Sequence, residues 1–355
     1  MAEWANPLHA DLDHILEHGG ELFGELEGAR IFITGGTGFV GRWMLESLIW
    51  ADAKLDLGVE AVVLSRDPGR LAARHPHLAT ARPITMLAGD VLNFESPEGE
   101  FTHALHMATE TNQVVAHAKP TLEFDTAVDG TRHMLRFAES AGVGKFLYTS
   151  SGAIYGTQPL TCDHVSETDV FAPLADNAKA AYGHGKRAAE FLCSAAHLET
   201  GIETTIARLF SFVGPYLDIN AGYAVGNFIR DALAGNTITI GGDGTPRRSY
   251  LYAADLALWL WTILLKGRPG QAYNTGSDQD LSILELAETV SRVLCPDAHI
   301  EVAQTPVPGA LPARYVPDIT RARDELGLSP IISLEDGIGR TAEWHRNANR
   351  TGSEA

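Results

Sequence analysis

The segment from Thr34 to Gly41 constrains the fold of this chain most, because its glycines have G-x-x-G-x-x-G spacing. An apolar run of strand type, Ala29–Ile33, precedes it, and Arg42–Trp50 follows with apolar residues at helical spacing. Glycine allows a tight turn, close approach of the backbone to a pyrophosphate, and packing of the helix on the strand. A pyrophosphate there would meet the free N–H groups and the dipole of the helix N-terminus. The segment predicts a dinucleotide site, with a simple turn as the alternative.

Beyond this loop the chain alternates strand-like and helix-like segments, which is the pattern of a parallel sheet covered by helices. The segments are Arg30–Ile33, a helix from Val40, Ala61–Leu64, Thr85–Leu87, Ala104–Met107, a helix through Thr131–Ser140, Lys145–Thr149, a long helix around Tyr182–His197, and Thr204–Leu209. We predict an α/β fold with a Rossmann-type, doubly wound parallel sheet. The later chain is rich in glycine and proline turns, and we expect a smaller C-terminal α/β region there.

The same pattern divides the chain into three predicted parts. Residues 1–28 carry a short amphipathic pattern and form an N-terminal helical extension. Residues 29–210 with about 249–276 form the dinucleotide-binding Rossmann domain. Residues 211–248 with about 277–347 form the substrate-binding region.

Composition narrows the class of partner. The chain has 27 basic and 45 acidic residues, a net charge of −18, and shows no basic patch, so we expect no nucleic-acid partner. Three widely spaced cysteines indicate reduced thiols in a cytoplasmic protein. The longest apolar stretch, Leu256–Leu265, is too short to span a bilayer, so we expect no membrane partner. Histidine pairs such as His103 and His106 have no third ligand nearby, and we expect no metal site.

Two segments offer catalytic chemistry. Tyr182 and Lys186 stand at i and i+4, so on a helix they share one face. An ammonium beside a phenol stabilises the phenolate and lowers the tyrosine pKa, which suits Tyr182 for proton exchange with a hydroxyl or a carbonyl. About thirty residues upstream, Thr149-Ser150-Ser151 ends a predicted strand, at the edge where open α/β sheets bind ligands. Alone, each segment is also compatible with a solvated helix face or a serine-rich turn.

Together and in this order, these motifs resemble the extended short-chain dehydrogenase/reductase family, in its nucleotide-sugar epimerase/dehydratase branch. The resemblance runs from about Arg30 to Trp344. Further matching segments are Gly89-Asp90-Val91, Gly130-Thr131, Ala207-Arg208-Leu209-Phe210, Val213-Gly214-Pro215-Tyr216, Gly244 to Leu256 with Arg248, and Arg314-Tyr315 followed by Asp318 and Leu326-Gly327.

The resemblance implies hydride transfer between a nicotinamide and a sugar carbon, C4, of a nucleotide sugar. Tyr182 would be the acid/base, Lys186 would lower its pKa and hold the nicotinamide ribose, and Ser151 would orient the reacting oxygen. The implied cofactor-binding residues are Gly35, Thr37, Gly38, Phe39, Val40, Ser65, Arg66, Asp90, Val91, Met107, Ala108, Thr149, Tyr182 and Lys186. The implied substrate-binding residues are Ser151, Ser211, Asn227, Arg248 and Arg314, with the two arginines on the diphosphate. A homodimer is also expected.

Departures from the family pattern narrow the reaction. Sugar 4,6-dehydratases of the family have an Asp-Glu pair directly after the catalytic serine or threonine, and decarboxylases tend to keep a glutamate near it. Here those positions are Gly152 and Ala153, neither of which can move a proton. Ala127 and Ser211 replace asparagines that the family often has, so we expect a substrate pocket unlike that of the common glucose/galactose epimerases.

The end of the second strand bears on the cofactor. An acidic residue at position 65 would bind the adenosine ribose and favour NAD, whereas Ser65-Arg66 offers a hydroxyl and a cation for a 2′-phosphate. We therefore expect NADP. Asp67 keeps NAD open, because a shift of one residue would bring its carboxylate to the ribose.

These observations favour a reductase that converts a 4-keto-6-deoxy sugar nucleotide with NADPH. A nucleotide-sugar 4-epimerase, whose cofactor is reduced only transiently, is the alternative. A 4,6-dehydratase and a non-catalytic nucleotide-sensing protein are less favoured, the second because Ser151, Tyr182 and Lys186 are all present.

Overall fold

The computed structural model describes residues 6–109 and 119–351, so the first five residues of the predicted N-terminal extension lie outside the described part. The chain forms two compact units. The first unit contains residues 1–156, 172–208 and 257–273, and the second contains residues 157–171, 209–256 and 274–355.

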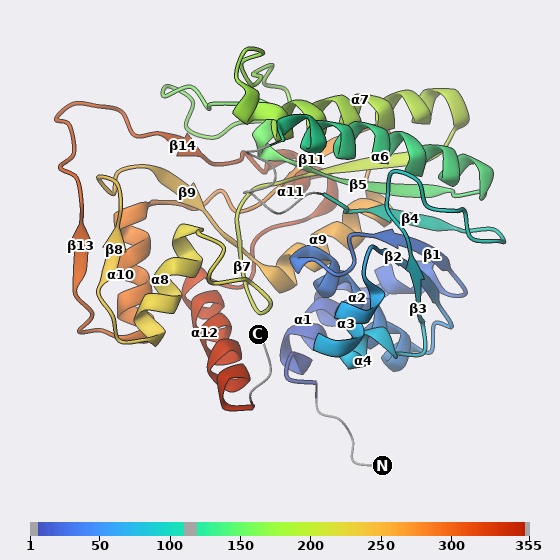
Figure 1. Ribbon diagram of the computed structural model, residues 1–355, viewed down its shortest axis with the longest axis horizontal. Helices are drawn as coiled ribbons and strands as arrows, with labels where there is room; N and C mark the ends of the chain where they lie inside the picture. The colour runs from blue at the N-terminus through green and yellow to red at the C-terminus, as the bar shows by residue number, and fades with distance from the viewer. Residues whose placement is uncertain (1–5, 110–118, 352–355) are drawn as a thin grey trace. The chain divides into compact units, whose positions relative to one another are not determined.

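A seven-stranded sheet organises the first unit, in the order β11-β6-β5-β4-β1-β2-β3 (Figure 1). Its strands are β1 (Arg30–Thr34), β2 (Glu60–Ser65), β3 (Ile84–Ala88), β4 (His103–His106), β5 (Lys145–Ser151), β6 (Glu203–Leu209) and β11 (Ala272–Thr275). The pairs that lead from β3 through β2, β1 and β4 to β5 are all parallel. The strand order reverses at β1, which is the arrangement of a doubly wound fold. The predicted Rossmann-type α/β fold is confirmed.

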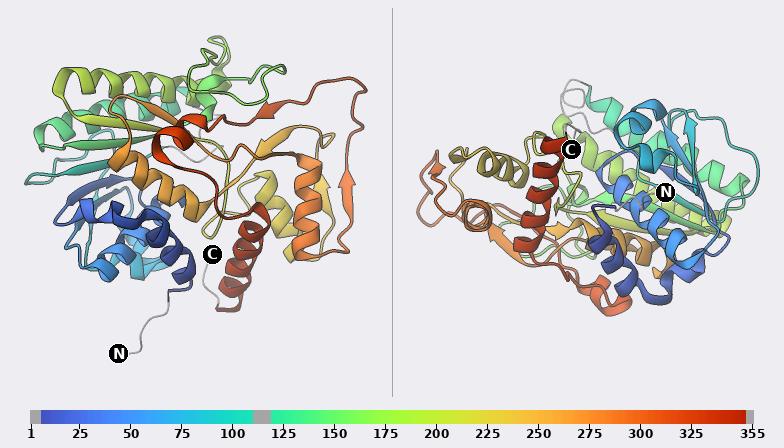
Figure 2. Two further views of the ribbon diagram at one scale, coloured as in Figure 1. Left: turned by 180° about the vertical axis from the view of Figure 1, so that it is seen from behind. Right: turned by 90° about the horizontal axis from the view of Figure 1, so that it is seen from below.

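Helices cover both faces of this sheet. The helical segments of the first unit are α2 (Phe39–Leu55), α3 (Pro68–Arg74), α4 (Pro76–Ala79), α6 (Pro120–Ser140), η2 (Gly152–Tyr155), η3 (Ala178–Ala180), α7 (Ala181–Thr200) and most of α9 (Ala253–Lys266). Helices α6 and α7 run side by side over one face (Figures 1 and 2). Because β1 alternates its side chains, Phe32 packs toward these helices, whereas Ile33 lies near α2 on the other face.

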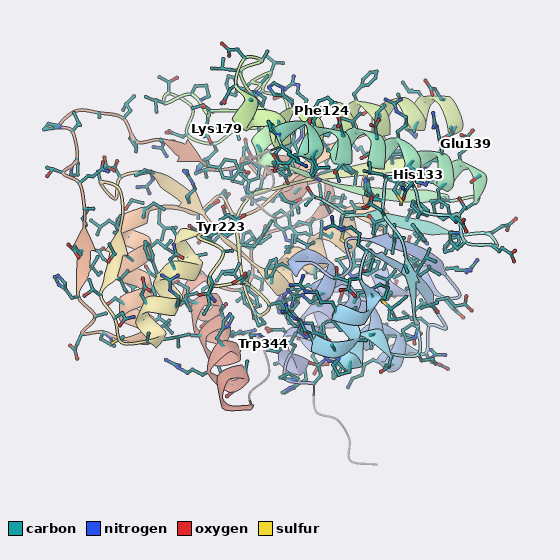
Figure 3. The ribbon with its side chains drawn as sticks, viewed as in Figure 1. Phe124, His133, Glu139, Lys179, Tyr223 and Trp344 are labelled. Carbon is teal, nitrogen blue, oxygen red and sulfur yellow. The ribbon has the colours of Figure 1, made fainter. Side chains whose placement is uncertain are left out.

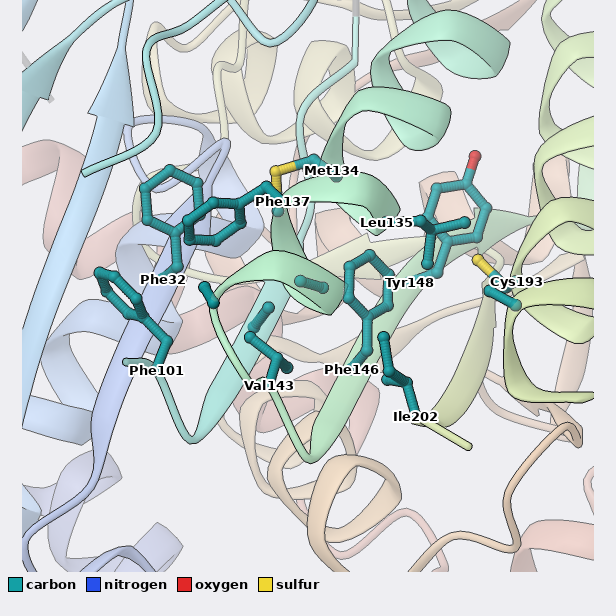
Figure 4. Packing of buried hydrophobic residues seen from close by; sticks show 14 of the residues in the cluster. Phe32, Phe101, Met134, Leu135, Phe137, Val143, Phe146, Tyr148, Cys193 and Ile202 are labelled. Atoms are coloured by element: carbon teal, nitrogen blue, oxygen red, sulfur yellow. The ribbon is translucent and has the colours of Figure 1, made fainter. Parts of the chain in front are cut away.

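The core under α6 and α7 is aromatic and fully enclosed. Phe32 lies 4.4 Å, between ring centroids, from Phe137 of α6, and both belong to one cluster with Phe146 and Tyr148 of β5 (Figure 4). Cys193 of α7 packs in the same cluster near Tyr148 (Figure 4). This packing joins β5, which ends at Ser151, to the helix that carries Tyr182 and Lys186.

The N-terminal extension packs on the first unit. It forms α1 (His9–Gly19) and a 3-10 helix, η1 (Gly20–Leu26), whose apolar side chains are buried. The Asn6 amide donates to the Glu46 carboxylate of α2 at 2.8 Å, and the Trp50 indole donates to Asp13 at 2.9 Å. These contacts place the extension against α2.

The second unit consists of small sheets and helices. Its strands are β7 (Phe212–Val213), β8 (Ile238–Ile240), β9 (Arg247–Ser249), β10 (Leu251–Tyr252), β12 (Asp280–Ser282), β13 (Ile300–Val302) and β14 (Arg314–Tyr315). Its helices are α8 (Ala224–Leu233), α10 (Ile283–Leu294), α11 (Thr320–Leu326) and α12 (Leu334–Thr351). Strand β9 lies between β12 and β14, so this three-stranded sheet brings Arg247 and Arg248 beside Arg314 and Tyr315.

The apolar stretch Leu256–Leu265 lies within helix α9 and is buried throughout. None of the helices in residues 6–109 and 119–351 combines the length and the apolar character that crossing a membrane requires. Cys162, Cys193 and Cys295 all carry free thiols.

Candidate active site

The glycine loop between β1 and α2 has the geometry that the sequence predicts. Gly35 has φ +73°, and a Cβ there would lie 2.5 Å from the carbonyl carbon of Met107. A Cβ on Gly41 would lie 2.2 Å from the Gly35 carbonyl oxygen. Side chains are therefore excluded at both positions, and the loop turns tightly beside the end of β4.

The start of helix α2 fits a pyrophosphate. Gly38 is the N-cap residue, and no side chain caps this helix end. Thr37 and Gly38 are exposed, and Phe39 and Val40 are half-buried. An uncapped helix N-terminus behind a loop that admits no side chain suits a bound anion. The residues present therefore fit the dinucleotide that the motif implies.

The ends of neighbouring strands complete the cofactor side of the site. Met107 and Ala108 follow β4 directly and flank Gly35, and the Ala108 N–H donates to the Thr34 hydroxyl at 3.2 Å. Asp90 and Val91 follow β3, where the Asp90 carboxylate accepts the Leu92 N–H at 2.9 Å. The structure brings these residues, with the glycine loop, to the carboxyl edge of the parallel sheet.

At the end of β2, the three adjacent side chains of Ser65, Arg66 and Asp67 have different surroundings. Ser65 is buried, and its hydroxyl accepts the Asp67 N–H at 3.2 Å. Asp67 is the N-cap of α3, and its carboxylate accepts the Arg70 N–H at 3.0 Å. Arg66, between them, is exposed. The Asp67 carboxylate, the acidic group that the sequence offered for the adenosine ribose, therefore caps helix α3.

Ser151 ends β5 and is 8% exposed. Its hydroxyl oxygen accepts the Ala153 N–H at 3.1 Å and so caps the 3-10 helix η2. The bond fixes the Ser151 side chain and leaves its O–H proton to donate elsewhere. Gly152 and Ala153, which follow it, bring no ionisable group to the turn.

Tyr182 and Lys186 lie in the first turns of α7, as predicted, and Tyr182 is half-buried. Lys186 is 2% exposed, and its ammonium donates to the Thr149 carbonyl at 2.8 Å. The same nitrogen lies 4.8 Å from the Tyr148 ring centroid and 5.8 Å from that of Tyr182. The structure thus holds Lys186 against both the tyrosine and the strand that ends at Ser151.

Burial sets the acidity of this lysine. It lowers the pKa of Lys186 from 10.5 to about 8, and the Glu190 carboxylate acts in the opposite direction. The ammonium is therefore charged at neutral pH and loses its proton as the pH rises through about 8. A charge held here would stabilise a phenolate at Tyr182.

Glycines beside Tyr182 and Lys186 allow α7 to sit this close to its neighbours. A Cβ on Gly183 would lie 2.5 Å from the Ala153 carbonyl oxygen. A Cβ on Gly185 would lie 3.1 Å from the Cα of Phe124, which Figure 3 labels on α6. The Tyr-Gly-His-Gly-Lys sequence therefore packs α7 against both the Ser151 turn and α6.

Sequence reasoning missed the role of His106 at the end of β4. Its ring nitrogens contact the hydroxyls of Thr34 at 2.8 Å and Thr131 at 3.0 Å. Burial, with a smaller contribution from Lys186, lowers the pKa of His106 to about 3, so the ring is neutral. It joins the strand before the glycine loop to α6. The sequence feature that could have indicated this role is a histidine at the end of an apolar strand. We considered His106 only as one of a pair of possible metal ligands.

The predicted substrate residues Ser211, Asn227, Arg248 and Arg314 all lie in the second unit. Ser211 precedes β7, and its carbonyl accepts the Leu251 N–H at 3.0 Å. Asn227 lies on α8, where its amide oxygen accepts from Arg230 at 3.1 Å. The structure brings Arg248 and Arg314 together on adjacent strands, β9 and β14. Ser211 and Asn227 lie elsewhere in the same unit, before β7 and on α8.

Arg314 is already paired in this structure. It contacts the carboxylates of Asp280 at 3.1 Å and Asp163 at 3.0 Å. Arg248 instead donates to the Arg247 carbonyl at 2.8 Å and lies 5.7 Å from the Tyr315 ring centroid. A diphosphate that binds Arg314 must therefore compete with the Asp163 carboxylate.

A Rossmann-type sheet with Ser151, Tyr182 and Lys186 at its carboxyl edge defines an enzyme of the extended short-chain dehydrogenase/reductase type. The chain belongs to the NAD dependent epimerase/dehydratase family, whose model matches residues 31–276. Across the described ranges, no group of three or more metal-ligating side chains is present.

Known relatives come from the nucleotide-sugar enzymes. The chain is 32% identical over 321 residues to UDP-glucuronic acid decarboxylase 1 of Arabidopsis thaliana, with 90% of this chain and 70% of the relative covered. It is 30% identical over 310 residues to UDP-glucuronic acid decarboxylase 6 of the same plant, with 87% and 86% covered. It also resembles the crystal structure of DesIV, a dTDP-glucose 4,6-dehydratase from Streptomyces venezuelae with NAD and TYD bound. That match has 26% identity and a TM-score of 0.74, and covers 92% of this chain and 99% of DesIV.

Proposed function

We propose that this protein reduces a 4-keto-6-deoxy sugar nucleotide at the sugar C4, with NADPH as the reductant. One observation carries the proposal. Ser151, Tyr182 and Lys186 form a proton-transfer site, but Gly152 and Ala153 offer no acid or base for elimination or decarboxylation. Such a site supports exchange of one hydride and one proton at a carbonyl, and little else.

A bound nicotinamide would supply the hydride. Tyr182 would donate its phenol proton to the C4 oxygen, and Ser151 would donate a hydrogen bond to the same oxygen. The Lys186 ammonium, fixed on the Thr149 carbonyl, would stabilise the phenolate that remains. Because these groups are held in place before the reaction, they meet the developing charge without rearrangement.

The preference for NADP rests on the end of β2. Asp67 caps α3, and the exposed Arg66 directly follows the buried Ser65. A guanidinium pairs well with a phosphate. The related DesIV was solved with NAD, so the ratio of the two cofactors is a direct test of this part of the proposal.

Substrate and assembly complete the proposal. Arg248 and Arg314 on adjacent strands would hold the diphosphate, which would orient the sugar from a distance.

We also propose a homodimer through α7, because Phe191 and Leu198 are 70% and 85% exposed on that helix.

The test incubates the enzyme with NADPH or NADH and a panel that includes dTDP-4-keto-6-deoxyglucose and UDP-glucuronic acid. We expect reduced cofactor to be consumed with a 4-keto-6-deoxy sugar nucleotide, and faster with NADPH. No consumption across the 4-keto sugars would refute a reductase. Release of carbon dioxide from UDP-glucuronic acid would indicate the activity for which its decarboxylase relatives are named.

A 4-epimerase is the second candidate, because small residues after the serine resemble those of the family's epimerases. It would retain its cofactor and return the hydride within each turnover. Oxidised cofactor that copurifies with the protein, together with an isomerised product and no net redox change, would favour this activity.

A further inference from the structure

Behind the catalytic residues, the first unit contains a buried ion pair that the proton-transfer steps do not use. Arg208 on β6 and Glu190 on α7 have side chains that are 13% and 9% exposed. The guanidinium binds the carboxylate through two nitrogens of one edge, Nε to Oε1 at 3.1 Å and Nη2 to Oε2 at 2.8 Å. Its remaining nitrogen, Nη1, donates to the Tyr155 phenol oxygen at 2.7 Å. Arg208 therefore joins two segments that are far apart in the sequence.

Both segments carry catalytic residues. Glu190 lies one helical turn beyond Lys186 on the same face of α7. Tyr155 is 2% exposed and ends η2, the short helix that Ser151 caps through its hydroxyl. The two segments pack so closely that a Cβ on Gly183 would lie 2.5 Å from the Ala153 carbonyl oxygen. A shift at Arg208 would therefore change the separation of Ser151 and Tyr182.

We propose that Arg208 is a positioning residue that holds the Ser151 turn and the Tyr182–Lys186 helix at their working separation, and that its pair with Glu190 sets the electric field at Lys186. The first half rests on the proposed catalytic roles. The second half concerns only the charges around Lys186 and is independent of the substrate.

Among the groups around Lys186, Glu190 is the one whose charge most affects the protonation of the lysine. From β5 it faces the Tyr148 ring and the Thr149 carbonyl, and from β4 the neutral His106. From α7 it faces Tyr182, Cys193 and Glu190, and the neighbouring Gly185 packs on Phe124 and Ala127 of α6.

Burial raises the pKa of the Cys193 thiol well above its usual range, so that group is neutral. Glu190 is thus the anion that favours the charged form of Lys186, and Arg208 is the cation paired with it.

Two substitutions, one removing the negative charge and one the positive charge of the pair, distinguish this electrostatic role from a structural one. Carbon-13 NMR of lysine Cε would follow the titration of Lys186, assigned with Lys186→Arg. In Glu190→Gln the anion is gone and the Arg208 charge remains, so we expect the Lys186 pKa to fall below that of the wild type. In Arg208→Gln the anion is uncompensated, so we expect the pKa to rise. Shifts in the same direction, or no shift in either variant, would overturn the proposal.

Arg208→Lys tests position separately, and it also serves if Arg208→Gln fails to fold. It keeps the charge, but a single ammonium nitrogen cannot replace the two bonds to Glu190 and reach Tyr155 as well. We expect an unchanged Lys186 titration, and a kcat with NADPH and dTDP-4-keto-6-deoxyglucose that is roughly 10- to 100-fold lower with little change in KM. An unchanged kcat, or a loss confined to KM, would refute the positioning role.

Glu60→Gln provides the matched control. Glu60 pairs with Arg30 at 3.4 Å and is 72% exposed. The two residues begin β2 and β1, at the amino ends of the strands and away from Ser151. This variant should leave both the titration and kcat unchanged. If the wild type consumes no cofactor with the 4-keto sugars, the proposed reaction fails, while the NMR titrations still decide the electrostatic half.

Discussion

Asp163→Asn should strengthen the binding of a nucleoside diphosphate, because it removes the carboxylate that competes for Arg314. Asp163 lies 3.0 Å from the guanidinium and is 75% exposed. Pairs exposed to this degree contribute about 0.2–1 kcal/mol. Since about 1.4 kcal/mol corresponds to a tenfold change in affinity, Kd should fall by roughly 1.4- to 5-fold. Arg314 keeps its contact with Asp280 in the variant, so the arginine remains in place.

The assay is calorimetric titration of the wild type and the variant with UDP and with dTDP. Asp278→Asn is the matched control, since Asp278 is a carboxylate of the same unit that pairs with Arg323 and not with Arg314. The gain should shrink at high ionic strength, because salt screens an exposed charge. An unchanged Kd would show that Arg314 does not bind the diphosphate. A raised Kd would show that Asp163 contacts the ligand favourably, which would also contradict the reasoning.

Three further predictions concern the cofactor side. Arg66→Glu should lower kcat/KM for NADPH roughly 10- to 100-fold, the value of a charge-assisted bond to phosphate, and an unchanged ratio of NADPH to NADH would exclude a 2′-phosphate contact. Gly35→Ala should abolish NADPH binding in a fluorescence titration, because its Cβ would meet the Met107 carbonyl carbon at 2.5 Å, whereas Gly58→Ala, at a similar positive φ but with open space around it, should bind normally. The rate of reduction should decline as the pH rises through about 8, where Lys186 loses its proton and Tyr182 loses the cation that makes it acidic; a rate that stays level well above this pH would contradict that role.

The features that could be predicted from the sequence are those that local spacing determines. The glycine loop and the i, i+4 relation of Tyr182 and Lys186 each follow from one segment of the chain. Alternation of apolar runs likewise indicated the doubly wound sheet, because parallel strands need helical crossovers. These elements lie where the spacing placed them, within a few residues at their ends.

The contacts that could not be predicted join segments that are remote in sequence. Arg208 is 53 residues from Tyr155 and 18 from Glu190, and only the packing of β6, η2 and α7 brings the three together. The pairing of Arg314 with Asp163 depends in the same way on the fold of the second unit. Charge and residue type identified these arginines as candidates, but their partners decide what each one does.

Tyr182→Phe tests the central claim most directly. The change removes the phenol oxygen and keeps the ring that lies near Lys186. Consumption of NADPH with dTDP-4-keto-6-deoxyglucose should fall roughly 10²- to 10⁴-fold, the usual contribution of a positioned acid, while NADPH binds as it does to the wild type. A variant that retains the wild-type rate would show that Tyr182 is not the proton donor, and the proposed site would be wrong.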